Sequence, residues 1–507
     1  MQDGHAASKV QTFKTYIGGK WQDAASGKRY QSFNPYTAEP WAEIPECAAI
    51  DVEHAVDAAH KAFTTGPWPN MTQSARGKLL RRIGDLALQH AEYLGQIETR
   101  DNGKLISEMS IQTRFLAEWY YYYGGLADKI AGSVVPSDKP DHFTYTLREP
   151  LGVCTFILPW NSPLLLVAYK LAPALATGNT VVIKPSEFTS ASTLEFCRLV
   201  LEPAGVPAGV VNVITGYGAV VGEPLVTHPK VAKVAFTGGS VTGARVNELA
   251  ARTFKKVSLE LGGKSPNIVF DDAILDDAVN GAVSGIFAAS GQTCIAGSRL
   301  LLQESIHDQF VEKLLALAKT AKLGDPSKFE TQVGPVTTPP QYQKILGYID
   351  IAKGEGAKCV LGGGPASKAE GGGTYFVKPT IFTGVDNKMR IAQEEVFGPV
   401  LSIIPFKDDE HAVEIANDVI YGLGSGVWTQ KVSRALTMAK RIRAGTVWVN
   451  TYRAVSPLMP FGGYKASGLG RENGATAIDE YLQTKAVWIN LGGNAGNPFV
   501  MKTAAPS

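Results

Sequence analysis

Short apolar runs alternate with helix-like segments from residue 152 onward. The runs have the length and β-branched content of buried strands, and the segments between them are long enough to be crossover helices. The predicted strands are 152–160, 180–186, 210–216 and 233–238, and the predicted helices lie near 163–176, 190–204 and 219–228. This order predicts a parallel sheet in a doubly wound α/β fold of the kind that binds nucleotides. A second alternating stretch runs from about 265 to 461.

The segments that flank this stretch have other patterns. Short strands and turns are expected over 13–48, and helices over 51–66, 73–102 and about 105–130. Asp51 and Thr72 are the expected N-caps of the first two helices, because their short polar side chains can accept from free backbone N–H groups. The helix over 105–130 contains Trp119 and the run Tyr120 to Tyr123, and we interpret the tyrosine run as packing residues rather than as a binding platform.

Two extended segments, 143–150 and 483–490, are isolated from any helix. They are expected to pair with each other and to present a sheet edge to another subunit. The stretch after residue 491 has little periodicity and is expected to be a loose tail or a wrapping arm.

The length and net charge of the chain limit the number of domains and the kinds of partner that we expect. A chain of 507 residues is too long for one hydrophobic core, so two or three domains are expected. The net charge of +2 gives no electrostatic reason to expect nucleic acid or an anionic membrane as a partner. No apolar run of about 18 residues and no targeting signal occurs, so we expect a cytoplasmic protein.

The cysteines and histidines do not form a recognisable metal or disulfide pattern. The five cysteines are far apart in the sequence, and they are Cys47, Cys154, Cys197, Cys294 and Cys359. No CxxC, HExxH or HxxxH spacing occurs, so neither a disulfide framework nor a metal site is expected. No GxSxG motif occurs either, which argues against a serine hydrolase of the α/β class.

Three glycine-rich segments invite comparison with phosphate-binding loops. The segment 263–265 reads GKS, but Ser258 stands where a P-loop needs a glycine. The segment 216–222 is one residue too long for GxGxxG. In FTGGSVTG, Gly238 and Gly243 are expected to open a helix whose N–H groups could meet a pyrophosphate, although turn formation alone would also explain these glycines.

Two further segments carry reactive side chains. The first, 259–266, places Glu260 just before two glycines at the end of a predicted strand. The second, 287–298, places Cys294 among small residues that leave its sulfur accessible. Taken alone, a cysteine is most often a small buried hydrophobe and a glutamate a solvated surface group.

Both segments match the glutamate and cysteine signatures of the aldehyde dehydrogenase superfamily, which the chain resembles over nearly its whole length. Further matching motifs are FNPYTAE near the start, PWNSP at 159–163, KPSE at 184–187, EEVFGP at 394–399 and PFGGYKASGLGRE at 460–472. The resemblance implies a Rossmann-like NAD-binding domain, an α/β catalytic domain and a small β element for oligomerisation. The implied bounds are 1–130 and 151–262 for the NAD-binding domain, 263–461 for the catalytic domain, and 131–150 and 476–507 for the oligomerisation element and tail.

The resemblance implies a mechanism in which Cys294 attacks the aldehyde carbonyl to form a thiohemiacetal. The side chain of Asn161 and the backbone N–H of Cys294 would hold its oxyanion. Hydride transfer to NAD would leave a thioester, and Glu260 would activate the water that hydrolyses it to the acid. A CoA-acylating enzyme is a rival, which the presence of Glu260 disfavours. A non-catalytic binding protein on the same fold is a second rival.

The cofactor residues also follow from the resemblance. They are Leu158, Trp160, Lys184, Glu187, Gly238, Gly243, Glu395 and Phe397. Lys184 and Glu187 would bind the adenosine ribose, and the carboxylate would repel a 2′-phosphate, which favours NAD over NADP. Two positions depart from the family pattern: Gly239 replaces a hydroxyl residue, and Ser162 replaces an aromatic, which could widen the substrate tunnel.

The expected substrate pocket is mainly apolar and suits an aliphatic or aromatic aldehyde. Its predicted residues are Ser162, Leu166, Tyr169, Thr293, Ile295, Arg453, Val455 and Phe461. Arg453 leaves two alternatives open: a semialdehyde whose distal carboxylate it binds, or an ordinary solvated loop arginine. The resemblance further implies a homodimer or homotetramer.

Overall fold

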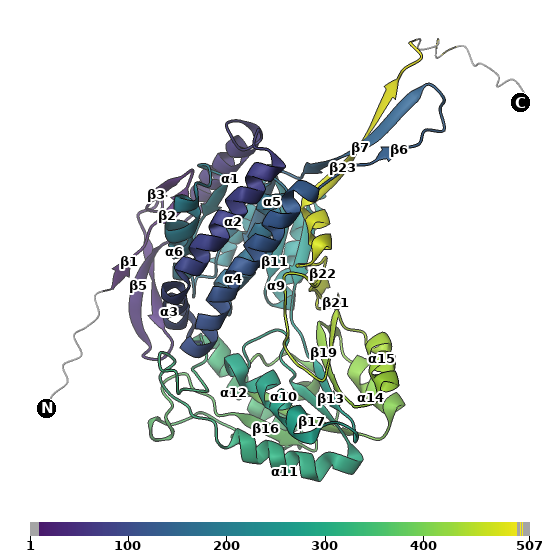
Figure 1. The fold of residues 1–507 in the computed structure, drawn as a ribbon. Coiled ribbons are helices and arrows are strands. Elements are labelled where there is room, and N and C mark those ends of the chain that lie inside the picture. The colour runs from purple at the N-terminus through teal and green to yellow at the C-terminus, as the bar shows by residue number, and fades with distance from the viewer. Residues whose placement is uncertain (1–9, 494–496, 498, 500–507) are drawn as a thin grey trace, which may run out of the picture.

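The computed structural model describes residues 10–493, 497 and 499. The chain forms two bodies, each built around one large sheet, and a strand pair projects from the first body (Figure 1). The predicted α/β class is confirmed. The tail expected after residue 491 falls mostly outside the described residues. Within the described part of the chain, no helix is long and apolar enough to cross a membrane.

The first body contains an eight-stranded sheet in the order β22-β12-β11-β8-β9-β10-β2-β3. Its central strands are parallel, and they are β8 (Val153–Ile157), β9 (Thr180–Lys184), β10 (Val211–Val213), β11 (Val231–Thr237) and β12 (Lys256–Glu260). Antiparallel strands extend both edges, and they are β2 (Thr15–Ile17), β3 (Lys20–Gln22) and β22 (Gly468–Leu469). The four strands predicted between 152 and 238 are therefore confirmed. The strand order reverses between β8 and β11, and ligands of such sheets bind at the carboxyl ends of strands at this point.

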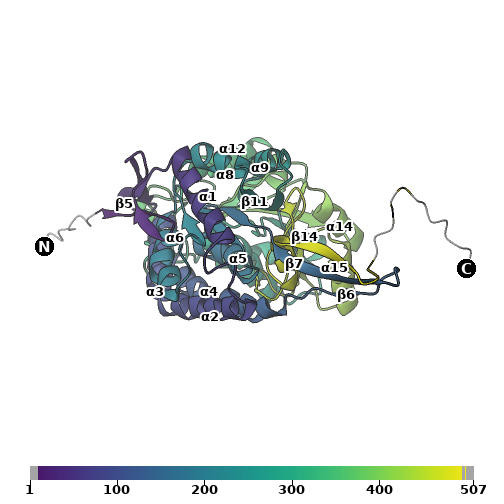
Figure 2. The same ribbon diagram turned by 90° about the horizontal axis from the view of Figure 1, so that it is seen from above.

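Helices cover both faces of this sheet (Figure 2). One face carries α1 (Ala49–Thr64), α8 (Glu223–Thr227) and α9 (Ser240–Ala251), whose apolar residues share a core with the strands. The other face carries α2 (Gln73–Gln89), α3 (Ala91–Asn102), α4 (Ile106–Leu126), α5 (Pro163–Ala176), α6 (Ala191–Phe196) and α7 (Glu202–Ala204). A small sheet of β1 (Gln11–Thr12), β5 (Glu39–Pro45) and β4 (Arg29–Asn34) flanks the body.

Some helix boundaries differ from the predictions. Thr72 is confirmed as an N-cap, because its hydroxyl accepts from the N–H of Ala75 at 3.2 Å. Asp51 is not an N-cap: α1 begins at Ala49, and the Asp51 carboxylate reaches back from inside the first turn to the N–H of Ala48 at 2.8 Å. The single helix expected over 73–102 is two helices, because His90 leaves the helical region with φ −101° and ψ 9°.

The second body contains a seven-stranded sheet in the order β15-β16-β17-β14-β13-β19-β20, parallel except for β15. Its strands are β13 (Pro266–Val269), β14 (Arg299–Gln303), β15 (Lys358–Leu361), β16 (Thr380–Thr383), β17 (Val400–Phe406), β19 (Gly424–Trp428) and β20 (Thr446–Val449). Its helices are α10 (Leu275–Phe287), α11 (His307–Ala318), α12 (Pro339–Gly354), α13 (Arg390–Gln393), α14 (Asp409–Asn417) and α15 (Val432–Arg441). A two-stranded sheet of β18 (Tyr421–Gly422) and β21 (Tyr464–Lys465) lies beside it.

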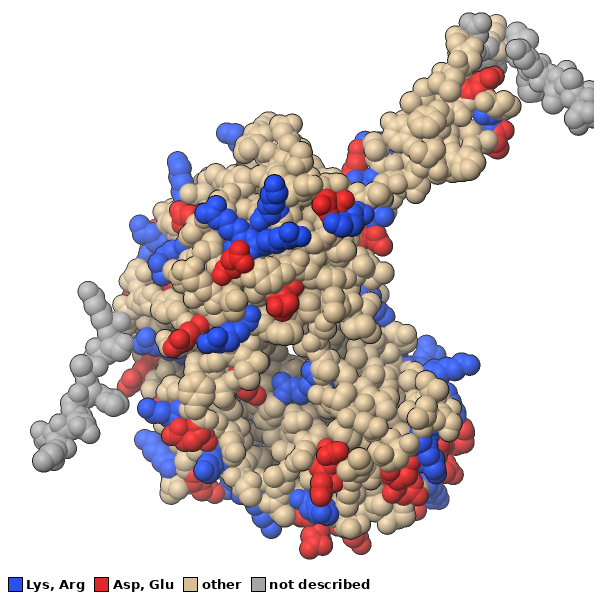
Figure 3. Space-filling view, in the orientation of Figure 1, with Lys and Arg blue, Asp and Glu red and all other residues tan. Residues whose placement is uncertain are grey.

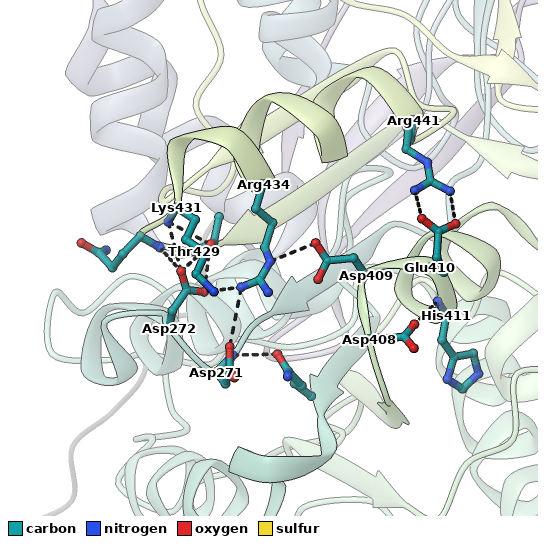
Figure 4. Close-up of polar contacts among 12 residues, drawn as sticks. Asp271, Asp272, Asp408, Asp409, Glu410, His411, Thr429, Lys431, Arg434 and Arg441 are labelled. Carbon is teal, nitrogen blue, oxygen red and sulfur yellow. Dashed lines mark hydrogen bonds and ion pairs between the residues drawn. The ribbon is translucent and has the colours of Figure 1, made fainter.

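An ionic cluster anchors α15 to this second body (Figure 4). The Arg434 guanidinium donates to Asp272 at 2.8 Å and to Asp409 at 3.1 Å, and its side chain is only 13% exposed. Asp272 also accepts from the hydroxyl of Thr429 at 2.9 Å. The cluster therefore joins α14, α15 and the ends of β13 and β19.

Removing this guanidinium is expected to destabilise the fold. Arg434→Leu leaves two carboxylates without their charged donor, so we expect the free energy of unfolding to fall by about 1–3 kcal/mol. Urea unfolding followed by fluorescence measures the change. The matched control is Arg252→Leu, because Arg252 pairs with Glu248 on an open surface. Equal losses in the two variants would contradict the role of the cluster.

The projecting strand pair is formed by the two segments that were expected to pair. β7 (His142–Pro150) and β23 (Leu482–Asn490) are antiparallel over their full length, from Leu482 opposite Pro150 to Asn490 opposite His142. The predicted pairing is therefore confirmed, and β6 (Val134–Val135) adds a third strand. This small sheet exposes large apolar side chains, which are Val134, Val135, Phe143, Leu147, Trp488 and Ile489.

Candidate active site

A cavity of about 650 Å³ lies at the carboxyl ends of β8, β11 and β12, where the first body faces the second. The space-filling view shows the surface hollowed between the two bodies (Figure 3). The cavity brings together Cys294, Glu260 and Asn161, which are far apart in the sequence. All eight predicted substrate residues line it, and so do Trp160, Gly238, Glu395 and Phe397. Leu158, Lys184, Glu187 and Gly243 lie outside its wall.

Tight backbone turns place Cys294. After α10 the chain takes positive φ at three successive residues, Ala289, Ser290 and Gly291. A side chain on Gly291 would meet the carbonyl of Gly398 at 2.1 Å, so only glycine fits there. A side chain on Gly263 would meet the Cys294 carbonyl at 2.3 Å. Gly263, three residues after Glu260, thus lets the glutamate segment and the cysteine segment come into contact.

The Cys294 thiol is protonated at rest. Burial raises its pKa to about 12, and the nearby carboxyl groups of Glu395 and Glu260 act in the same direction. The backbone N–H of Cys294 and the ammonium of Lys104 act in the opposite direction. A thiolate here consequently needs a nearby proton acceptor.

Asn161 lies between the sheet and the cysteine loop. It follows β8 and comes just before α5, which starts with Pro163 at its first position. Its amide nitrogen donates to the carbonyl of Gln292 at 3.0 Å, which fixes the amide against the loop that carries Cys294. The amide nitrogen carries a second N–H donor, and Asn161 lines the cavity, so this donor is available to a ligand there.

Glu260 ends β12 and is 3% exposed. Neither of its carboxyl oxygens has a hydrogen-bond partner among the described residues. Burial raises its pKa well above the usual value, and the charge of Glu472 adds to this rise, whereas Lys170 and Arg471 oppose it. The raised pKa moves the ionisation of this carboxyl group to a higher pH than that of a solvated glutamate, and it makes the carboxylate a stronger base.

Lys170 and Glu472 form a buried ion pair directly behind Glu260. Lys170 also donates to the hydroxyl of Thr237 at 2.7 Å, at the end of β11. Lys170 belongs to α5, and Glu472 belongs to the segment that follows β22. The ion pair therefore links two segments of the first body beside the cavity.

The predicted adenosine-ribose residues lie side by side at the end of β9. The Lys184 ammonium donates to the Glu187 carboxylate at 3.1 Å. The Leu158 N–H donates to the carbonyl of Lys184 at 3.0 Å, which ties the end of β8 to this pair. Glu187 keeps a side-chain exposure of 28%, so its carboxylate remains accessible to a ligand.

The predicted pyrophosphate turn differs in detail from the expectation. The N–H of Gly238 donates to the Glu260 carbonyl at 3.0 Å, and that of Gly243 donates to the Gly239 carbonyl at 2.9 Å inside α9. Neither glycine therefore offers a free N–H. The free donors are the first-turn N–H groups of residues 240–242. A side chain on Gly238 would meet the Phe236 ring at 2.6 Å, and one on Gly243 would meet Leu261 at 2.3 Å, so both glycines serve close packing.

Glu395 and Phe397 approach from the second body. Glu395 accepts from the Gly263 N–H at 2.9 Å, and burial raises its pKa. Phe397 has a φ of 60° and lies edge-on to Trp160, with 5.3 Å between the ring centres. The Gln341 amide donates to the Phe397 carbonyl at 3.0 Å and holds it in this conformation.

The sequence reasoning missed part of the cavity wall. These residues come from α4 with the turn before it and from α12, and they are Lys104, Glu108, Met109, Ile111, Gln112, Phe115, Trp119, Gln341 and Lys344. Trp119 stacks on Tyr169 at 5.0 Å and donates to Asn473 at 2.7 Å, so it packs against α5 and also lines the cavity. The only sequence signal for this part of the wall would have been the spacing of Met109, Phe115 and Trp119 along one face of α4.

These features fit a dinucleotide. The free N–H groups at the start of the twelve-residue helix α9 suit a pyrophosphate, and the lysine–glutamate pair at the end of β9 suits ribose hydroxyls. The fold and the cavity together define a nicotinamide-dependent dehydrogenase with a cysteine beside its cofactor site.

The chain belongs to the aldehyde dehydrogenase family, whose model matches residues 21–487. It is 48% identical, over 97% of its length and 100% of the relative, to (Z)-2-((N-methylformamido)methylene)-5-hydroxybutyrolactone dehydrogenase of Acinetobacter baylyi. It is 44% identical to aldehyde dehydrogenase 1A1 of Homo sapiens, over 95% of this chain and 96% of that one.

Solved structures of relatives share the fold. Betaine aldehyde dehydrogenase of Staphylococcus aureus in complex with NAD+ superposes with a TM-score of 0.95 at 40% identity, over 97% of this chain and 98% of that one. An NAD+ complex of an aldehyde dehydrogenase from Bacillus cereus gives a TM-score of 0.92 at 42% identity, over 95% and 97%. The protein is an NAD-dependent aldehyde dehydrogenase, as the sequence motifs predicted.

Proposed function

We propose that the protein oxidises an aldehyde to its carboxylic acid through a covalent intermediate on Cys294. The observation that carries this proposal is the convergence of Cys294, Asn161 and Glu260 in one cavity beside the dinucleotide residues. A solved structure of Staphylococcus aureus betaine aldehyde dehydrogenase holds a BME-modified cysteine, which supports a reactive thiol in such a site.

In this mechanism the thiol proton of Cys294 passes to Glu260, and the sulfur forms a bond to the aldehyde carbon. The Asn161 amide and the Cys294 N–H stabilise the oxyanion of the thiohemiacetal. Bound NAD supplies the acceptor for the hydride that leaves this carbon. The product is a thioester on Cys294. Glu260 releases the thiol proton to solvent and then takes a proton from water. The resulting hydroxide attacks the thioester carbon and releases the acid and the thiolate.

The activity is expected to rise with pH. Burial raises the pKa of Cys294 to about 12 and raises the pKa of Glu260 well above its usual value, so the deprotonation of both groups is shifted to higher pH. Raising the pH from about 7 to about 9 therefore increases kcat/KM. A profile that is flat or falls over this range would contradict these proton positions.

A test of the function is a panel of aliphatic, aromatic and carboxylate-bearing aldehydes, each supplied with NAD or NADP and without CoA. NADH formation with an equal amount of acid is the expected result. We propose that NAD is preferred because the Glu187 carboxylate would repel the 2′-phosphate of NADP. A requirement for CoA would favour the acylating alternative instead.

We propose an apolar aliphatic or aromatic aldehyde as the substrate. The supporting observation is the cavity wall, in which Phe115, Leu166, Tyr169, Val455 and Phe461 present apolar side chains. The two relatives named for their substrates act on chemically different molecules, so they do not choose one for this chain.

The alternative is a semialdehyde whose distal carboxylate pairs with Arg453. It is supported by the position of Arg453 in the cavity wall, where the guanidinium donates to the Ser284 carbonyl at 3.3 Å. This alternative requires that Arg453→Ala lower kcat/KM for a carboxylate-bearing aldehyde by about tenfold more than for a neutral aldehyde of equal length. The neutral aldehyde is the control, and an equal effect on both would eliminate the alternative.

We further propose three functional units with the bounds predicted from the sequence: an NAD-binding domain over 1–130 and 151–262, a catalytic domain over 263–461, and an oligomerisation element over 131–150 and 476–507. The exposed apolar side chains of the β7–β23 pair support a homo-oligomer that covers them.

A further inference from the structure

Lys104 is a buried cation in the wall of the substrate cavity, and the mechanism above gives it no role. It lies in the turn between α3 and α4, and the residue is 6% exposed. In the described part of the chain its ammonium makes one hydrogen bond, to the Ser162 hydroxyl at 2.8 Å. An ammonium carries three N–H donors, so two of them remain for another acceptor.

Two carboxylates near Lys104 each accept a backbone N–H, and neither has a hydrogen bond to the Lys104 ammonium, although Oε2 of Glu108 is buried without a partner among the described residues. Glu98, on α3, accepts from the Leu164 N–H at 2.8 Å, and Glu108, on α4, accepts from the Ala289 N–H at 2.7 Å. Both charges nevertheless raise the pKa of Lys104, whereas burial and the charge of Arg453 lower it, to about 8. The Cys294 sulfur is the remaining titratable group that faces it, from the loop after α10.

Ser162 is a small residue between Lys104 and the cavity. The residue directly follows Asn161, and its side chain ends at the hydroxyl that Lys104 contacts. Both residues line the cavity together with Cys294. A large side chain at position 162 would stand between the ammonium and the substrate space. The small serine instead leaves a charged donor open to the same cavity as the apolar side chains of Phe115 and Leu166.

We propose that Lys104 determines substrate specificity by donating a hydrogen bond to a neutral carbonyl oxygen on the chain of the aldehyde substrate. A buried donor without an acceptor costs free energy, and a substrate oxygen removes that cost. A carbonyl suits this position better than a carboxylate, because a substrate anion would lie close to Glu108 and Glu98. This inference rests on the proposed function and narrows its substrate to an apolar aldehyde that carries one acceptor oxygen.

The test compares aldehydes that differ only in this oxygen. A series of keto-aldehydes of increasing chain length is paired with the alkyl aldehydes of equal length and with the matching carboxylate-bearing aldehydes. For the best chain length, wild-type kcat/KM is expected to favour the keto-aldehyde over the alkyl aldehyde by about tenfold or more. Lys104→Met should bring this ratio close to one. Lys61→Met, on the exposed face of α1, is the matched control and should keep the wild-type ratio.

Three results would overturn the proposal: no wild-type preference for any keto-aldehyde, an unchanged ratio in Lys104→Met, or faster oxidation of the carboxylate-bearing aldehyde. A protein that forms no NADH from any aldehyde would instead refute the proposed function itself.

The pH dependence of the wild-type ratio tests the same proposal without a variant. Cys294 and Glu260 act on all substrates alike, so their titration cancels in the ratio. Loss of the Lys104 proton weakens a charge-assisted donor, so the preference for the keto-aldehyde should fall as the pH rises through about 8. A ratio that stays constant from about pH 7 to about pH 9 would contradict the role of the ammonium.

Discussion

Replacing Cys294 with alanine is expected to lower the turnover of every aldehyde by about 10⁴-fold or more. The thiol is the only side chain in the proposed mechanism that bonds to the aldehyde carbon, and no other described cysteine lines the cavity. NAD binding should persist, because the dinucleotide residues lie on other elements. Steady-state NADH formation and equilibrium binding of NAD measure the two effects.

Cys359→Ala is the matched control for this variant. Cys359 is also partly buried and unpaired with another cysteine, but it lies on β15 in the second body and away from the cavity. The control should keep the wild-type rate. If Cys294→Ala retained more than about a tenth of that rate, the covalent mechanism would be wrong.

Glu260→Gln is expected to separate the two halves of the reaction. The glutamine keeps the size of the side chain but cannot take a proton from water, so thioester hydrolysis should slow by about 10²- to 10³-fold. NADH forms before hydrolysis, so a burst of about one equivalent per subunit should precede a slow steady state. Rapid mixing with absorbance detection of NADH measures both phases.

The matched control is Glu118→Gln, on the exposed face of α4. It should show the wild-type time course. A Glu260→Gln variant with the wild-type steady-state rate would refute the assignment of Glu260 as the base. The same variant should also show a smaller rise in steady-state rate with pH than the wild type, because the contribution of Glu260 is lost while that of Cys294 remains.

The reactive core of the site was predictable because each part is local in the sequence. Glu260 and Cys294 lie in short segments whose glycines and small residues have a geometric reason: Gly263 and Gly291 allow contacts that any side chain would block. The strands of the parallel sheet were predictable for a similar reason, since buried strands read as continuous apolar runs.

Other parts depend on tertiary contacts that no short segment contains. Lys104 looks like an ordinary lysine after a glycine, and its place in the cavity depends on Ser162, which is 58 residues away. The N–H of Gly238 is used by the Glu260 carbonyl, and only the register of β11 against β12 determines this bond. No proline or glycine stands next to His90, where the helix breaks, so local propensity does not predict the end of α2.

The most direct test of the covalent mechanism is mass spectrometry of the Glu260→Gln variant after it reacts with an aldehyde and NAD. The covalent mechanism predicts an acyl group on the peptide that contains Cys294, formed only when NAD is present and absent from the double variant with Cys294→Ala. NADH formation without this adduct, or an acyl group on a different residue, would contradict it.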